Sequence, residues 1–318
     1  MITLDVYIGP MAGVATSMLW TATSLFFTAA GKRIGPTVVN AGRILLAIVL
    51  HGVTFRLLAG TWIPDVLAGQ VLFLALSGII GLSIGDQALF TAFVDIGPRL
   101  AMLIMTTAPL FAALFGWVVL DETLGAIASL GIVLTIGGVA WVVLERPQGK
   151  VSGLAPHRMR GIIFALVAAA CQAGGLLLSK QGMGHGWLPE DQHLAPQAAT
   201  LIRMLFAGVG VIPIVVLHAR RERTRRAAGV FPEPVGSRRA GFLFASCGAV
   251  VGPYLGVWMS LVASDRAPLG IAQTLCSLPP IFLLPFAALI HKEHISLRSI
   301  IGAVIAVAGS ALLFIQPQ

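Results

Sequence analysis

The feature that most constrains the fold is a series of ten apolar stretches of twenty or more residues, separated by mostly short connections that carry Gly, Pro or charge. An α-helix rises about 1.5 Å per residue, so about 20 apolar residues cross the roughly 30 Å hydrocarbon core of a bilayer. Only 11% of the residues are charged, whereas a soluble domain typically carries about 25%. We therefore predict an all-α integral membrane protein with ten transmembrane helices, at residues 9–30, 37–58, 66–94, 99–119, 125–144, 160–180, 196–218, 240–263, 268–290 and 296–315.

Five of these predicted helices repeat the other five. A shift of 171 residues aligns the last three helices of each half in one register, pairing Pro109 with Pro280 and Glu122 with Glu293. An odd number of helices per repeat places the two halves in opposite orientations, and inverted repeats are typical of secondary transporters. We expect a first five-helix repeat at residues 9–145, a linker at 146–159 and a second repeat at 160–316.

Basic residues predict the orientation in the membrane. Sixteen lie in the odd-numbered connections, against three in the even-numbered connections and the two ends of the chain. Because cytoplasmic loops carry an excess of Lys and Arg, we expect the odd connections in the cytoplasm and both termini outside it, in a bacterial inner membrane. The same bias explains the net charge of +8, so nucleic acid is not an expected partner.

Three charged residues fall well inside predicted helices: Arg43, Asp86 and Arg203. A charge at the bilayer centre costs about 2.5–3.5 kcal/mol on insertion scales, so each needs a partner or a wet cavity. An ion pair between Arg43 and Asp86 would meet that need. In one interpretation, Asp86 carries a coupling proton or cation, and an arginine binds an anionic substrate group through its planar fork. In the other, the charges only hold helices together.

Further polar and helix-breaking residues are candidates for the substrate pathway. Gln172 and Gln273 lie on apolar helices, where an amide either joins two helices or orients a ligand in a cavity. Pro109 and Pro280 occupy matching positions in helices four and nine, and proline kinks a helix by removing a backbone donor. We expect these prolines to supply hinges or to expose backbone beside a cavity, with kinked but static packing as the alternative.

Small residues recur at every fourth position on the third helix of each half, as Ser77, Gly81 and Gly85 in the first half and Gly248, Gly252 and Gly256 in the second. Faces of this kind let two backbones approach closely, which favours helix packing in a membrane. We expect tight packing at both faces, with the two helices crossing each other at the pseudo-twofold axis.

Each half of the chain resembles a known family. The first half contains GLSIGDQALFTAFVDIGPRLAMLIMTTAPLFAALFGWVVLDETLGAIASLGIVLTIGGVAW, and the second repeats the pattern as APLGIAQTLCSLPPIFLLPFAALIHKEHISLRSIIGAVIAVAGSALL. The Pro-containing helix, the Glu at its end and the Gly-rich closing helix resemble the EamA-type domain of the drug/metabolite transporter superfamily. The resemblance implies ten helices in an inverted five-plus-five repeat and export of metabolites, amino acids or drugs by alternating access.

These observations predict a secondary transporter that exports small metabolites. The sequence has no G-x-x-x-x-G-K-[ST] motif for ATP, so a gradient or an exchanged solute would drive it. The expected partners are a small-molecule substrate, the lipid bilayer and a coupling proton or counter-solute, with no cofactor, no metal and no catalytic residues.

Two other functions remain open at this point. One is a membrane-embedded enzyme or lipid-handling protein with a midplane site, and the other is a passive channel. The stretch GLSIG around Ser83 matches the G-x-S-x-G pattern of serine hydrolases. That pattern needs a strand-to-helix elbow, and no strand pattern surrounds Ser83.

Overall fold

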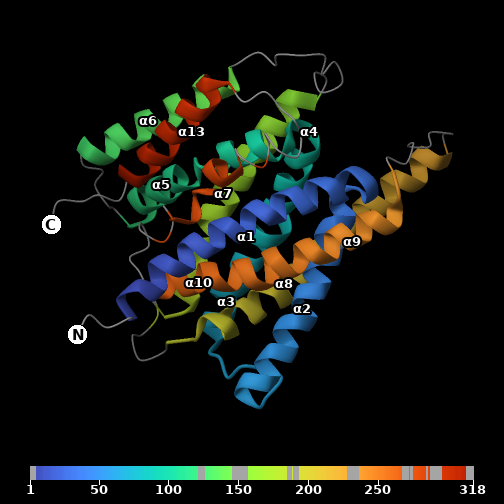
Figure 1. Ribbon diagram of the computed structural model, residues 1–318. Helices are drawn as coiled ribbons and strands as arrows, with labels where there is room; N and C mark the ends of the chain where they lie inside the picture. Colours follow the sequence, from blue (N-terminus) through green and yellow to red (C-terminus); the bar gives the residue numbers. More distant parts are fainter. Residues whose placement is uncertain are drawn as a thin grey trace.

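The computed structural model describes residues 5–120, 126–144, 157–184, 188, 193–227, 236–266, 272, 275–283, 286 and 296–312. Every regular element in these ranges is helical (Figure 1). The main helices are α1 (Asp5–Ile34), α2 (Pro36–Ala59), α3 (Ala68–Ser77), η1 (Gly78–Gly85), α4 (Asp86–Met105), α5 (Ala108–Leu120), α6 (Ala126–Val143), α7 (Arg158–Gly182), α8 (Pro196–Ala227), α9 (Arg238–Ala249), η3 (Val250–Gly256), α10 (Val257–Arg266) and α13 (Leu297–Leu312).

Apolar helices of membrane-spanning length are present in both halves. Within the described ranges, five helical stretches are long and apolar enough to cross a bilayer: Pro36–Ala59, Ala68–Met105, Arg158–Gly182, Pro196–Thr224 and Arg238–Arg266. Two shorter apolar helices are Ser129–Val142 and Leu297–Gly309. The all-α prediction is therefore confirmed. The number of ten spans stays a prediction, because much of the expected ninth span lies outside the described residues.

The third and fourth predicted spans are separated by a sharp backbone break inside α4. Gly97 has φ of 77°, in the left-handed region that glycine adopts without strain, and Pro98 follows it directly. Proline has no amide hydrogen to donate to the preceding turn, so the helix restarts at Pro98 in a new direction. The break falls between the expected spans 66–94 and 99–119.

The last helices of the two halves, α6 and α13, lie side by side (Figure 1). A methyl group added at Gly138 would lie 2.7 Å from the carbonyl oxygen of Gly302, and one added at Gly309 would lie 2.8 Å from that of Gly131. The residue numbers of the contacting glycines rise along one helix as they fall along the other, so the two helices are antiparallel. The 171-residue shift exchanges Gly131 with Gly302 and Gly138 with Gly309. A twofold axis between inverted repeats would produce this reciprocal contact.

The first face of small residues packs tightly against α7. The Ser77 hydroxyl donates to the carbonyl oxygen of Gly175 at 2.5 Å. A methyl group at Gly81 would lie 3.5 Å from the Gly175 Cα, and one at Gly85 would lie 2.7 Å from the Cβ of Cys171. The absence of a side chain at Gly85 therefore allows η1 and α7 to approach this closely.

The second face of small residues packs against α1 instead. Methyl groups added at its glycines would lie within 3 Å of three side chains, as Gly248 against Phe27, Gly252 against Thr23 and Gly256 against Trp20. Tight packing is thus present at both faces, but the expected crossing of the two helices is wrong. Each face instead receives the first helix of the opposite half, because α1 and α7 fill the space that a crossing would need.

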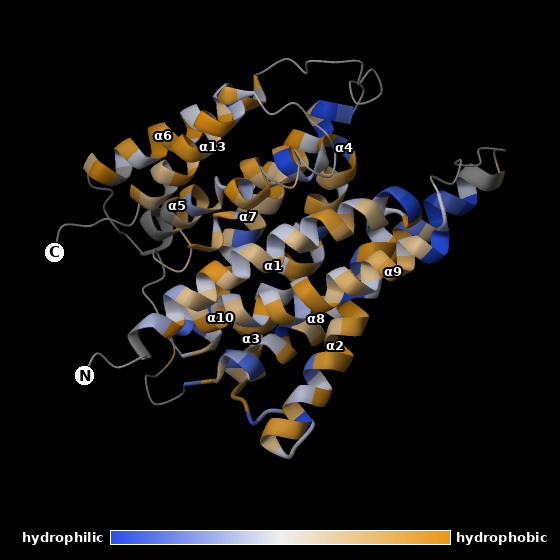
Figure 2. Ribbon diagram, in the orientation of Figure 1, coloured by the Kyte–Doolittle hydropathy of each residue, from blue (hydrophilic) through white to orange (hydrophobic). Residues whose placement is uncertain are grey.

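Hydrophilic residues gather at helix ends, and apolar residues cover the middle of the bundle (Figure 2). The end of α1 lies beside the start of α9, where a methyl group at Gly241 would be 2.7 Å from Ile34 Cγ2. The start of α7 lies beside the α4 break, where Arg160 donates to Asp95 at 2.6 and 2.8 Å. These are odd-numbered connections, and they lie toward one end of the bundle, at the upper right of Figure 2.

Candidate functional site

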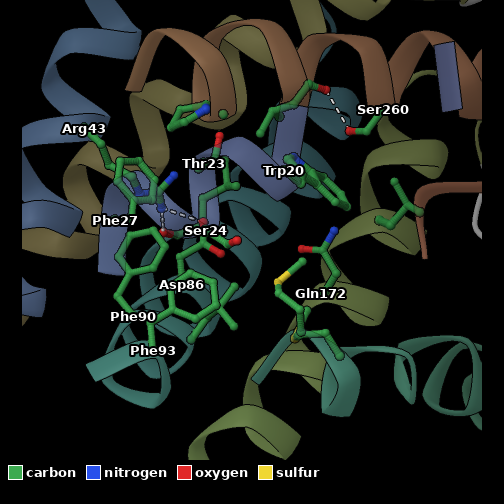
Figure 3. A pocket seen from close by; sticks show the side chains of 18 of the residues that line it. Trp20, Thr23, Ser24, Phe27, Arg43, Asp86, Phe90, Phe93, Gln172 and Ser260 are labelled. Carbon is green, nitrogen blue, oxygen red and sulfur yellow. Dashed lines mark hydrogen bonds and ion pairs between the residues drawn. The ribbon is translucent and has the colours of Figure 1, made fainter. Parts of the chain in front are cut away.

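A cavity of about 70 Å³ lies between helices of both halves (Figure 3). The rings of Phe27, Phe90 and Phe93 gather on one side, with Trp20 and Gln172 on the other (Figure 3). The described residues that line it are Trp20, Thr23, Ser24, Phe27, Arg43, Leu82, Asp86, Leu89, Phe90, Phe93, Met102, Met105, Gln172, Leu176, Arg203, Gly252, Pro253, Val257 and Ser260.

The predicted ion pair between Arg43 and Asp86 is present on the cavity wall. Arg43 Nη2 donates to Asp86 Oδ2 at 2.5 Å and to the Leu82 carbonyl oxygen at 2.7 Å. Asn40 Oδ1 accepts from Arg43 Nε and Nη2 at 3.1 and 2.9 Å. The guanidinium carbon also lies 4.9 Å from the centre of the Phe90 ring. Arg43, only 2% exposed, therefore has both a counter-charge and hydrogen-bond acceptors.

Helical spacing and a widened turn place these groups together. Asn40 and Arg43 are three residues apart, so they share one face of α2. That face meets η1, where the Ser83 carbonyl oxygen accepts from Asn40 Nδ2 at 3.0 Å. The segment η1 is π-helical, with the Asp86 amide bonded to the Gly81 carbonyl five residues earlier. Such turns are rare and are frequent at functional sites. η3 is π-helical at the equivalent positions of the second half.

Arg203 reaches the same cavity from α8 and lies within electrostatic range of Asp86. Its side chain is 4% exposed. Arg203 Nε is buried and has no hydrogen-bond partner in the part of the chain that the structure describes. The same is true of the Thr23 hydroxyl on α1, which also lines the cavity. The cavity thus contains one arginine, Arg43, whose Nε and Nη2 both have partners, and another, Arg203, whose Nε has none among the described residues.

The other predicted pathway residues have different outcomes. Gln172 lines the cavity, whereas Gln273 lies outside the described residues. Neither Pro109 nor Pro280 is among the described lining residues. Pro109 is the second residue of α5, and Pro280 is the second of the helical residues 279–283. In the first turn of a helix, the amide hydrogen that proline lacks would have no hydrogen-bond partner in any case. Each proline therefore begins a new helix after an interruption, and neither kinks a continuous helix.

Comparison with known proteins shows the family of the chain. A model of the EamA-like transporter family matches residues 7–144 and, a second time, residues 159–315. The chain belongs to the EamA-like transporter family. The resemblance to the drug/metabolite transporter superfamily is thereby confirmed, and the apolar helices are those of an integral membrane protein.

Solved structures share the fold of this EamA-like transporter. One of them is described as "Crystal structure of protein", with 18% identity, a TM-score of 0.61 and 96% of each chain covered. At this identity the likeness concerns the fold alone. No curated protein matches the chain.

The aromatic wall of the EamA-like transporter's cavity was not predicted from its sequence. Phe90 follows Asp86 by four residues and so lies on the same face of α4, a spacing that could have placed it. Trp20 and Phe27 had no such signal, because nothing in the sequence of α1 shows which face turns toward the cavity. Their positions depend on the packing of α1 against η3 and α9.

Two residues with hydrolase-like chemistry have structural contacts instead. The Ser83 hydroxyl donates to the Ala207 carbonyl oxygen at 2.8 Å, a group that cannot act as a general base. His51 is fully buried, and its Nε2 lies 3.2 Å from the Pro253 carbonyl oxygen. These contacts tie η1 to α8 and α2 to η3, and they do not favour the enzyme interpretation.

Proposed function

We propose that this EamA-like transporter is a secondary transporter that exports small metabolites by alternating access, driven by a gradient or by exchange. The observation that carries the proposal is the cavity between the two halves, with the Arg43–Asp86 pair and Arg203 on its wall. Buried charges beside a cavity at membrane depth are expensive, and they mark substrate and ion pathways.

The origin of the cavity walls supports alternating access. α1, α2, η1 and α4 of the first half face α7, α8, η3 and α10 of the second half. A movement of one half against the other would therefore close one route to the cavity and open another. The matching interruptions before Pro109 and Pro280 would supply hinges for that movement.

Asp86 is the group that we assign to coupling. It is the one acidic residue in the described lining, and 17% of its side chain is exposed. A proton or a counter-solute that binds Asp86 would weaken its attraction to Arg43. Because Arg43 lies on α2 and Asp86 on α4, the weaker attraction would loosen the contact between these two helices.

Extracellular metabolite profiles of cells that produce wild type, Asp86→Asn or Asp95→Asn would test this function. Asp95 is a matched control, because it is a buried acid of the same helix, is paired with Arg160 and is not among the described lining residues. We expect the wild type and Asp95→Asn to raise the level of at least one metabolite over time. Asp86→Asn should leave that metabolite at the empty-vector level.

The membrane level of each variant has to be equal for this comparison. Identical profiles for the wild type and the empty vector would then contradict export of native metabolites. Export by Asp86→Asn at the wild-type rate across pH would contradict the coupling role alone. Transport that neither saturates nor exchanges would indicate a passive channel.

We further propose an orientation in a bacterial inner membrane, with repeats at 9–145 and 160–316 and both termini outside the cytoplasm. The gathering of basic connections at one end of the bundle supports it. A C-terminal green fluorescent protein fusion should be dark, and an alkaline phosphatase fusion at the same site should be active. Bright fluorescence with an inactive phosphatase would reverse the orientation.

A further inference from the structure

We propose that the cavity binds an organic monoanion with an apolar body, whose anionic group is held by Arg203 and Thr23. The inference rests on the proposed function, because the bound anion would be the transported substrate. It narrows the substrate from small metabolites in general to one charge class and one shape.

Arg43 is not free to bind such an anion. Its Nε and Nη2 already donate to Asn40, Leu82 and Asp86. One face of the guanidinium is covered by the Phe90 ring. A ligand would have to replace contacts with fixed backbone and amide groups, so Arg43 is assigned to holding Asp86 and η1.

Arg203 and Thr23 each offer the anion a buried donor on the cavity wall. Both line the cavity, both are more than nine-tenths buried, and Arg203 Nε and Thr23 Oγ1 have no partner among the described residues. A buried donor without a partner costs about 1–3 kcal/mol, and more when the group is charged. A carboxylate would offset this cost, because it accepts hydrogen bonds from guanidinium and hydroxyl groups together.

The charges in the cavity select a monoanion over other ligands. Among the described lining residues, Arg43 and Arg203 carry two positive charges and Asp86 carries one negative charge. A monoanion would neutralise the excess of one. A zwitterion would leave the excess in place, and a cation would double it, which raises the cost of charge inside the protein.

The rest of the lining selects an apolar body. Besides its few polar groups, the wall is formed by aromatic, thioether and aliphatic side chains, namely Trp20, Phe27, Leu89, Phe90, Phe93, Met102, Met105, Leu176 and Val257. Aromatic side chains bury large areas and favour offset or edge-on contacts with another ring. An arylalkanoate combines such a ring with one carboxylate.

Three ligands with the same phenylethyl body would test the charge class on the purified full-length protein. They are 3-phenylpropionate, an anion, phenylalanine, a zwitterion, and phenethylamine, a cation. A ligand that binds only the folded state raises the unfolding temperature with concentration. We expect this concentration-dependent rise with 3-phenylpropionate and no rise with the other two.

Two arginine variants would assign the binding group. Arg203→Gln should weaken 3-phenylpropionate binding by about tenfold or more, since a charged hydrogen bond is lost. Without ligand it should unfold no earlier than the wild type, because the change removes a buried charge whose Nε has no described partner, and Arg43 remains to neutralise Asp86. Arg56→Gln is the control, because Arg56 is an exposed residue near the end of α2. It should keep the wild-type response.

Several results would overturn the inference. They are equal stabilisation by phenylalanine or phenethylamine, no stabilisation by 3-phenylpropionate, and an unchanged ligand response in Arg203→Gln. A ligand-free loss of stability in Arg203→Gln would mark this arginine as structural and overturn the inference as well. These readouts require no transport, so they stand apart from a failure of the export experiment. Export of a zwitterion alone would overturn the monoanion and leave the export function intact.

Discussion

Arg43→Met is expected to unfold at a much lower temperature than the wild type, with a loss of about 3–5 kcal/mol of stability. The substitution removes the donors to Asn40 Oδ1 and the Leu82 carbonyl oxygen, together with the counter-charge 2.5 Å from Asp86. The free-energy cost of leaving a buried carboxylate without its partner is larger than the stability that the intact pair contributes. Thermal unfolding of the purified protein, followed by tryptophan fluorescence, would measure the shift.

The double variant Arg43→Met/Asp86→Leu separates the charge from the packing. A buried ion pair replaced by apolar residues of similar volume often keeps its stability. We therefore expect the double variant to regain most of what Arg43→Met loses, although the acceptors of Asn40 and Leu82 stay unpaired. It should still fail to export, because Asp86 is gone. Equal instability of the single and double variants would show that the hydrogen bonds of Arg43, and not its charge, hold the helices.

The two intramembrane arginines show how far the sequence could be interpreted. Position alone identified Arg43, Asp86 and Arg203 as buried charges, and the need of such charges for a partner suggested the pair of Arg43 with Asp86, which is present. The division of roles between the arginines was not predictable. It depends on Asn40 and on the π-helical backbone of η1, and hydropathy and helical periodicity do not report a widened turn.

The helices themselves were predictable for a simpler reason. A bilayer sets one length for every span, so hydropathy located the helical stretches and Gly97–Pro98 marked a boundary between two of them. Which helix meets which was not predictable, as the small-residue faces show. Gly81 and Gly252 are on packed faces, but their partners Gly175 and Thr23 lie on α7 and α1. The spacing of glycines in a sequence predicts that a helix face packs closely, but it does not predict which helix packs against that face.

Gly78→Ala is the second change with a large expected effect, a loss of about 3 kcal/mol or a failure to fold. A methyl group at Gly78 would overlap the carbonyl oxygen of Arg203, and would lie 3.1 Å from its carbonyl carbon and 3.2 Å from the Ala207 nitrogen. These are backbone atoms of α8, which cannot rotate away as a side chain could. Relief therefore requires α8 to move away from η1. The shift of the unfolding midpoint in mixed detergent micelles would measure the loss.

Gly81→Ala is the matched control one turn further along η1. Its methyl group would meet Gly175 Cα at 3.5 Å and Arg203 Nη2 at 3.6 Å, both ordinary van der Waals distances. Alanine also favours the helix by up to about 1 kcal/mol over glycine, so the midpoint should stay level or rise. The same movement of α8 would displace Arg203, so any folded Gly78→Ala protein should also lose its response to 3-phenylpropionate. Equal stability of the two variants would contradict the close η1–α8 contact, and a retained ligand response in Gly78→Ala would separate that contact from the position of Arg203.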